Sequence, residues 1–134
     1  MNKRNLRLDK YDISSKRYKE LCGFCEQYPE WKHELESFSY MSGVKYSDMP
    51  KNPNMGTADT TGEYAVRRAM LEQKCKIIED AAKQADEENW KFLIGSACYE
   101  YSVTYLQMKG MYMGKSAFYE RRRYFFFLLN RAKT

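Results

Sequence analysis

Near its C-terminal end the chain reads Lys115-Ser-Ala-Phe-Tyr-Glu-Arg-Arg-Arg-Tyr-Phe-Phe-Phe-Leu-Leu-Asn-Arg131. Successive side chains of an α-helix step about 100° around its axis, so Phe118, Phe125 and Leu129 fall on one face and Leu128 lies beside them. Ser116 is a typical capping residue and is expected where this helix begins. The pattern predicts a helix that packs on a core along one face and offers polar groups on the other.

The opposite face of this helix carries the candidate binding residues. The outward positions are Ser116, Tyr119, Glu120 and Arg123. Arg121 and Arg122 flank the apolar stripe, where their stems can pack while the guanidinium groups reach outward. Phe127 also falls on the outer side, so either a partner subunit or another part of this chain should cover it.

The formal net charge of +5 resides in this same segment. From residue 115 to 134 one acidic residue, Glu120, stands against six basic ones, namely Lys115, Arg121, Arg122, Arg123, Arg131 and Lys133. Residues 1–114 hold equal numbers of basic and acidic side chains. A positive field concentrated in one segment favours an anionic partner there.

Length and composition predict one compact all-α domain. The 134 residues, with 43% apolar and 16% aromatic side chains, suffice for a single modest core. No apolar run is long enough to cross a bilayer, and no signal-peptide core follows the first residues, so we expect a cytoplasmic protein without membrane contact. We divide the chain into an N-terminal helical hairpin at 1–41, a loop or linker at 42–60 and a helical core at 61–134.

Helical periodicity and capping residues define the elements within these parts. Ser14 or Ser15 should cap a first helix that stops at Pro29, and a second helix should continue to about Tyr40. The longest helix is expected from about residue 61 to 85, buried on two sides. Its main apolar row is Tyr64, Arg68, Leu71, Cys75, Ile78, Ala82 and Ala85, and its second side is Val66, Met70 and Ile77.

Two further helices lead to the arginine-rich segment. Residues 86–88 are acidic and should open a helix with Trp90, Leu93, Ile94, Ala97 and Tyr101 on its inner face. Ser102 should cap a short helix over 103–109, which Gly110 ends. Residues 111–114 then turn the chain into the last helix. The overall prediction is a small helical bundle with a C-terminal helix-turn-helix candidate.

Catalytic and metal-binding signals are weak. Cys22 and Cys25 have the spacing of a metal or redox pair, but cysteines three residues apart also share a helical face, so core packing, zinc binding and redox chemistry stay open in that order. His33 lies on a charged helix and is expected to be exposed. No nucleophile with a plausible base stands out, and we expect no enzyme, no cofactor and no metal.

Four segments together carry a family resemblance. They are Tyr64-Ala-Val-Arg-Arg-Ala-Met-Leu, Ile77-Ile-Glu-Asp-Ala-Ala, Tyr99-Glu-Tyr-Ser-Val-Thr-Tyr-Leu and Phe118-Tyr-Glu-Arg-Arg-Arg-Tyr-Phe-Phe-Phe-Leu-Leu. The chain thereby resembles small proteins encoded by phages and prophages of Gram-positive bacteria, including late transcriptional regulators of the RinA or ArpU type. The C-terminal part of these regulators is similar to region 4 of sigma factors. The resemblance implies a recognition helix that begins near Ser116.

The resulting hypothesis is a regulator that binds double-stranded DNA. Arg123 would read guanine, and Ser116, Tyr119 and Glu120 would make neighbouring contacts. Lys115, Arg121 and Arg122 would bind phosphates. The plain alternative for these arginines is a solvated face paired to acids such as Glu87 and Glu88.

A second functional hypothesis is a protein-interaction module without specific DNA binding. It would bind RNA polymerase, another host or phage protein, or a second copy of itself. Its interface anchors would be Tyr124, Phe126 and Phe127, because large aromatic side chains dominate interface energetics.

Overall fold

The computed structural model describes the backbone of residues 11–42 and 57–134, and the side chains of 11–38 and 62–134. Every regular element in these ranges is a helix, which confirms the all-α prediction. The helices are α2 (Ser15–Glu26), α3 (Tyr28–Ser42), α4 (Thr57–Ala85), α5 (Trp90–Tyr99), α6 (Val103–Met108) and α7 (Lys115–Ala132).

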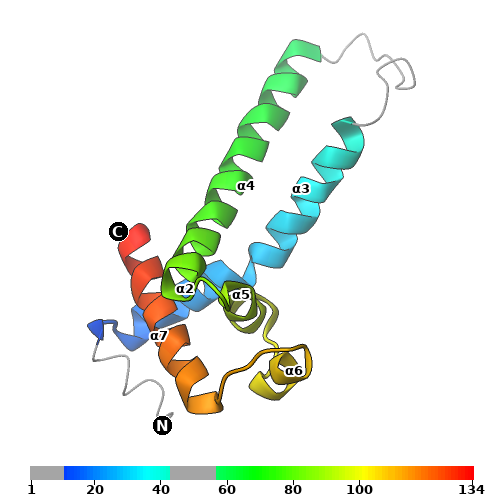
Figure 1. The fold of residues 1–134 in the computed structure, drawn as a ribbon. Coiled ribbons are helices and arrows are strands. Elements are labelled where there is room, and N and C mark those ends of the chain that lie inside the picture. The colour runs from blue at the N-terminus through cyan, green and yellow to red at the C-terminus, as the bar shows by residue number, and fades with distance from the viewer. Residues whose placement is uncertain (1–10, 43–56) are drawn as a thin grey trace.

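The helices form a compact base with a projecting two-helix arm (Figure 1). The C-terminal half of α4 packs against α7 and α5, while α2 packs against α5 and α7. The arm consists of α3 and the N-terminal half of α4, which run side by side away from the base. The core therefore lies where α2, α4, α5 and α7 meet, and α7 is one of its walls.

The first two helices follow the capping signals. Ser14 caps α2 by accepting a hydrogen bond from the Arg17 backbone N–H at 3.1 Å. Pro29 lies in the first turn of α3, where its missing N–H costs no helical hydrogen bond. Both helices thus form where the capping signals place them, although α3 continues to Ser42 and packs more extensively against α4 than against α2.

The long helix differs from its prediction at the N-terminal end. It begins at Thr57, so residues 57–60 are helical rather than part of the predicted linker, and residues 43–56 lie outside the described part. Burial on two sides is wrong for its first half, where Tyr64, Val66 and Met70 are exposed. The reason is the arm: α3 covers one side of this segment, and no other described helix reaches it.

The buried row of α4 nevertheless forms as predicted in its second half. Leu71, Cys75, Ile78, Ala82 and Ala85 are all buried. Small residues at the end of this row let the neighbouring helices approach α4 closely. The row therefore carries the contact between α4 and the base.

The connection between α4 and α5 corrects another boundary. The acidic residues 86–88 precede α5 instead of forming its first turn, since α5 begins at Trp90. Asp86 accepts hydrogen bonds from the backbone N–H groups of Glu88 and Asn89 at 3.1 and 3.2 Å, which fixes the turn. Tyr101, predicted on the inner face, lies beyond the end of α5 and is exposed.

The inner face of the C-terminal helix α7 consists of the apolar residues that were predicted for it. Phe118, Phe125 and Leu129 are fully buried, and Leu128 is partly buried beside them. Another part of the same chain covers Phe127, because the centre of its ring lies 5.3 Å from the ring centre of Tyr11. Arg17 on α2 donates to the Asn130 side chain at 2.6 Å and so joins α2 to α7.

No helix within the described ranges has the length and apolar character that a membrane crossing requires.

Candidate nucleic-acid interface

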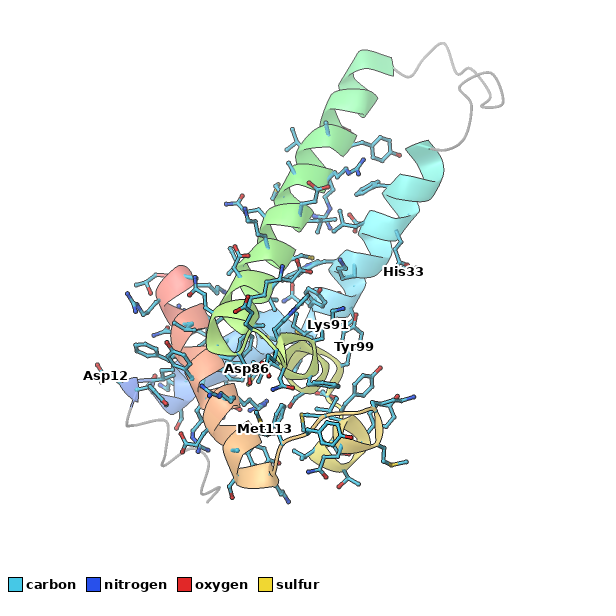
Figure 2. All side chains as sticks on the ribbon, viewed as in Figure 1. Asp12, His33, Asp86, Lys91, Tyr99 and Met113 are labelled. Carbon is cyan, nitrogen blue, oxygen red and sulfur yellow. The ribbon has the colours of Figure 1, made fainter. Side chains whose placement is uncertain are left out.

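The turn before α7 is held in place by contacts on both sides. Gly110 has φ +106°, a conformation that favours glycine, and ends the short helix α6. Met111 is buried, and the Gln107 side chain donates to the Met113 carbonyl at 2.9 Å. Met113 thus lies on the path from α6 to α7 (Figure 2). These contacts orient the start of α7 relative to α6.

The N-terminal turn of α7 is open. Gly114 is the N-cap residue and provides no side-chain hydrogen bond, so Ser116 lies inside the first turn and is not the predicted cap. Lys115, Ser116, Glu120 and Arg121 are exposed, while the fully buried Phe118 anchors the same turns. The start of α7 therefore presents backbone N–H groups and a lysine to solvent, an arrangement that attracts anions.

Arg121 is the arginine of the triplet that reaches solvent. Its side chain is 53% exposed, and its Nε lies 3.8 Å from Asp86 Oδ2. An ion pair of this length at the surface contributes little to stability. The pairing expected with Glu87 or Glu88 is thus made by their neighbour Asp86 instead. Arg121 remains accessible to a partner.

Arg122 points inward, contrary to the prediction. Its Nε donates to Ser96 Oγ at 3.1 Å, and Nη1 donates to the Tyr18 hydroxyl at 2.8 Å. Its guanidinium carbon also lies 4.9 Å from the centre of the Phe126 ring. Arg122 therefore links α7 to α2 and α5 through its Nε and Nη1.

The prediction that Arg123 points outward is wrong. The side chain is only 5% exposed, although periodicity placed it on the outer face. Nη2 donates to Glu120 Oε1, whereas Nε is buried without a hydrogen-bond partner. Phe127, one turn further along the same side of α7, is covered by Tyr11, so protein lies against this side of the helix. Arg123 cannot reach a base edge from this position.

Tyr119 takes an intermediate place. The side chain is partly buried against the core cluster, and its ring lies 6.3 Å from that of Phe118. Four of the seven predicted contact residues are exposed, and we name them together the α7 surface: Lys115, Ser116, Glu120 and Arg121. Ser116 and Glu120 lie opposite the buried Phe118, whereas Lys115 and Arg121 lie on either side of it.

No family model, curated protein or solved structure matches this chain. The α7 surface combines two cations, a hydroxyl and one carboxylate at the start of a firmly anchored helix.

Sequence patterns did not identify two exposed residues that precede the α7 surface in the chain. Met108 ends α6 and Tyr112 lies in the following turn, where its side chain is 98% exposed. Helical periodicity does not apply to a residue in a turn, so the sequence could not predict which way the Tyr112 side chain points. An aromatic ring so exposed beside the α7 surface is available to a partner.

The cysteines lie mainly in the core. Cys25, Cys75 and Cys98 are buried, Cys22 is partly buried, and all four are free thiols. A hydrogen bond with Cys98, together with burial, raises the pKa of Cys25, and burial raises that of Cys75 to about 11. No group of three or more metal-ligating side chains gathers within the described part of the chain. Burial of Cys25 fits the core interpretation of this pair.

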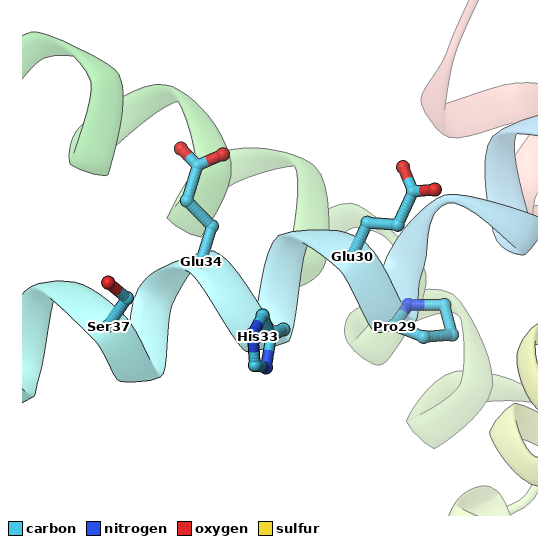
Figure 3. A pocket seen from close by; sticks show the side chains of 5 residues that line it. All are labelled: Pro29, Glu30, His33, Glu34 and Ser37. Carbon is cyan, nitrogen blue, oxygen red and sulfur yellow. The ribbon is translucent and has the colours of Figure 1, made fainter.

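His33 lies on a separate surface of α3. It is exposed, as predicted, and lines a shallow hollow with Pro29, Glu30, Glu34 and Ser37 (Figure 3). Glu34 accepts hydrogen bonds at 2.7 and 3.1 Å from Arg67 on α4, which lowers the pKa of its carboxyl group. All five lining residues come from one helix, so the hollow has no second wall that could enclose a substrate.

Proposed function

We propose that this protein is a phage or prophage regulator that binds double-stranded DNA through the α7 surface. The observation that carries the proposal is the exposed start of α7, with Lys115 and Arg121 in the one segment that holds the net charge. Its opposite face is fixed in the core by Phe118 and Phe125. A rigid helix with a cationic N-terminal end is the element that most DNA readers bring to the groove.

The buried arginines change the roles of the residues in this proposal. Lys115 and Arg121 contact phosphates, because both are exposed and neither is held by a short ion pair. Ser116 and Glu120 are the exposed polar side chains that could meet base edges. The Glu120 carboxylate already accepts from Arg123, so it would accept from the amino group of cytosine in addition to that bond. Arg122 and Arg123 hold α7 in place instead of touching DNA.

The helix-turn-helix part of the proposal uses α6 as the supporting helix. α6 packs on α5, and residues 109–114 connect it to α7. This connection is longer than the usual turn of three or four residues. The proposal therefore relies on the anchored start of α7 more than on close packing between α6 and α7. A role in transcription would place the protein in the cytoplasm.

Lys115→Ala combined with Arg121→Ala is expected to weaken duplex binding about tenfold or more at low salt. The variant neutralises fewer phosphates, so fewer counterions leave the DNA when it binds. The slope of log affinity against log salt should become shallower by about 2. The measurement is fluorescence anisotropy of a labelled duplex of about 30 base pairs across a salt series.

The matched control is Lys76→Ala, which removes an exposed lysine on α4 away from the α7 surface. An equal loss in this control, or unchanged binding in the double variant, would show that the α7 surface is not the DNA contact. If the double variant loses affinity and the control does not, selecting bound fragments from the encoding genome would establish the sequence preference.

The interaction-module hypothesis loses Phe126 as an anchor, because this side chain is buried, with its ring centre 5.0 Å from that of Tyr18. Tyr124 and Phe127 are only partly buried, and Phe127 packs against Tyr11 and Tyr124. The observation that favours protein contacts is instead the exposed stripe of Val66 and Met70 on the arm. We propose a second copy of the chain as the partner of this stripe.

Val66→Glu combined with Met70→Glu is expected to prevent this self-association, because two carboxylates on the stripe would be desolvated in the contact. The measurement is molar mass by light scattering over a range of protein concentrations. A mass equal to the monomer at every concentration in the unmodified protein would exclude a second copy on the arm.

A further inference from the structure

Four tyrosines from three parts of the chain form a continuous row outside the α7 surface. Tyr28 opens α3, Tyr99 ends α5, and Tyr101 and Tyr105 belong to the following turn and α6. Neighbouring ring centres lie 6.2 Å apart for Tyr28 and Tyr99, 5.7 Å for Tyr99 and Tyr101, and 4.7 Å for Tyr101 and Tyr105. We name these residues the tyrosine row; Figure 2 labels Tyr99 within it.

Most of the tyrosine row faces solvent. Tyr99, Tyr101 and Tyr105 are 40%, 42% and 39% exposed, whereas Tyr28 is buried and donates to Glu79 Oε2 at 2.6 Å. The three exposed hydroxyls have no hydrogen-bond partner among the residues that the structure describes. The row therefore offers adjacent aromatic surfaces together with hydroxyl groups that can still donate.

The backbone beneath the row fixes these rings in advance. Glu100 has φ +60°, and the backbone N–H groups of Glu100 and Tyr101 both donate to the Gly95 carbonyl. A Cβ atom on Gly95 would lie 3.2 Å from side-chain carbons of Tyr101 and Leu106. Glycine at this position thus lets the Tyr101 ring lie close over α5. A partner would meet rings that need little ordering on binding.

The charges around the row are nearly balanced. Lys32 lies 5.9 Å from the Tyr28 ring centre and 3.7 Å from Glu79, and Lys109 lies 5.4 Å from the Tyr105 ring centre. The exposed carboxylate of Glu100 follows Tyr99 directly in the chain. A polyanion would gain little from such a surface. An uncharged partner that packs on aromatic faces fits it better.

We propose that the tyrosine row binds a proline-rich extended segment of another protein. Proline-rich chains adopt the polyproline II conformation before binding, so they lose little entropy when they dock on aromatic-lined surfaces. Their backbone has few N–H donors and many free carbonyls, which the tyrosine hydroxyls can satisfy. This site is separate from the α7 surface, so it does not depend on DNA binding.

The test uses a fluorescently labelled decaproline peptide and the full chain, with binding measured by anisotropy. A Gly-Ser peptide of equal length serves as the peptide control. Tyr101→Ala combined with Tyr105→Ala should weaken decaproline binding at least about tenfold, since two ring contacts are lost. Tyr112→Ala removes an exposed aromatic side chain outside the row and should leave the affinity unchanged.

A second variant guards against a folding defect. Tyr99→Phe combined with Tyr105→Phe keeps the rings but removes two hydroxyls, and should weaken binding about fivefold with an unchanged circular dichroism spectrum. Decaproline binding no tighter than that of the Gly-Ser peptide would overturn the proposal. Tyrosine-dependent binding of an oligothymidine strand without decaproline binding would assign the row to single-stranded nucleic acid. A molar mass that falls to the monomer in the Tyr101→Ala, Tyr105→Ala variant would assign it to a second copy.

Discussion

Phe125→Ala is expected to lower the free energy of unfolding by about 3–5 kcal/mol. The ring is fully buried on the face by which α7 packs against α4, and it meets Phe126 edge to face at 5.1 Å. Removing it takes away apolar burial and leaves a cavity between helices that already pack closely. The α7 surface belongs to the same helix, so DNA binding should fall only to the extent that the variant is unfolded under the binding conditions.

Urea unfolding followed by far-UV circular dichroism measures this change as a shift of the midpoint. Tyr112→Ala is the matched control, because it also truncates an aromatic side chain but one that is 98% exposed. The control should change stability by no more than about 0.5 kcal/mol. A loss below about 1 kcal/mol for Phe125→Ala would mean that α7 is not a wall of the core.

Arg123→Met is expected to raise the free energy of unfolding by about 1–4 kcal/mol. The guanidinium is buried and forms an ion pair with Glu120, while its Nε has no hydrogen-bond partner. Methionine has a similar length and fills the space without a desolvated charge. Glu120 is exposed enough to be hydrated once the arginine is absent. Duplex affinity should stay within about twofold, because Arg123 does not reach the surface.

Thermal unfolding of Arg123→Met beside Arg121→Met provides the comparison. Arg121 is exposed and joined to Asp86 at 3.8 Å, so its replacement should leave stability almost unchanged and should weaken duplex binding. The two variants thus separate the buried arginine from the exposed one. A loss of stability in Arg123→Met, or a large loss of duplex affinity there, would contradict the assignment.

The helices and much of the core could be predicted from the sequence because they depend on local rules. Ser14 and Ser102 cap α2 and α6 through their own side chains, and Gly110 ends α6 with a positive φ. Helical periodicity placed Phe118, Phe125 and Leu129 in the interior. Capping and periodicity depend on residues close together in the chain, so these features could be predicted without knowledge of the tertiary contacts.

The candidate site could be predicted only in part. Periodicity gives the side of the helix on which a residue lies, but not which other parts of the chain cover that side. Lys115, Ser116, Glu120 and Arg121 face solvent as expected. Arg122 turns inward because Tyr18 and Ser96 arrive from α2 and α5, which are distant in the sequence.

The sequence by itself determined an all-helical chain, the inner face of α7 and the concentration of positive charge in one segment. Only the tertiary structure decided which arginine stays exposed, where the arm leaves α4 exposed, and that tyrosines from α3, α5 and α6 meet in a row. The physical reason is that burial and pairing depend on contacts between residues far apart in the chain, and the helical period of one segment contains no information about its neighbours in space.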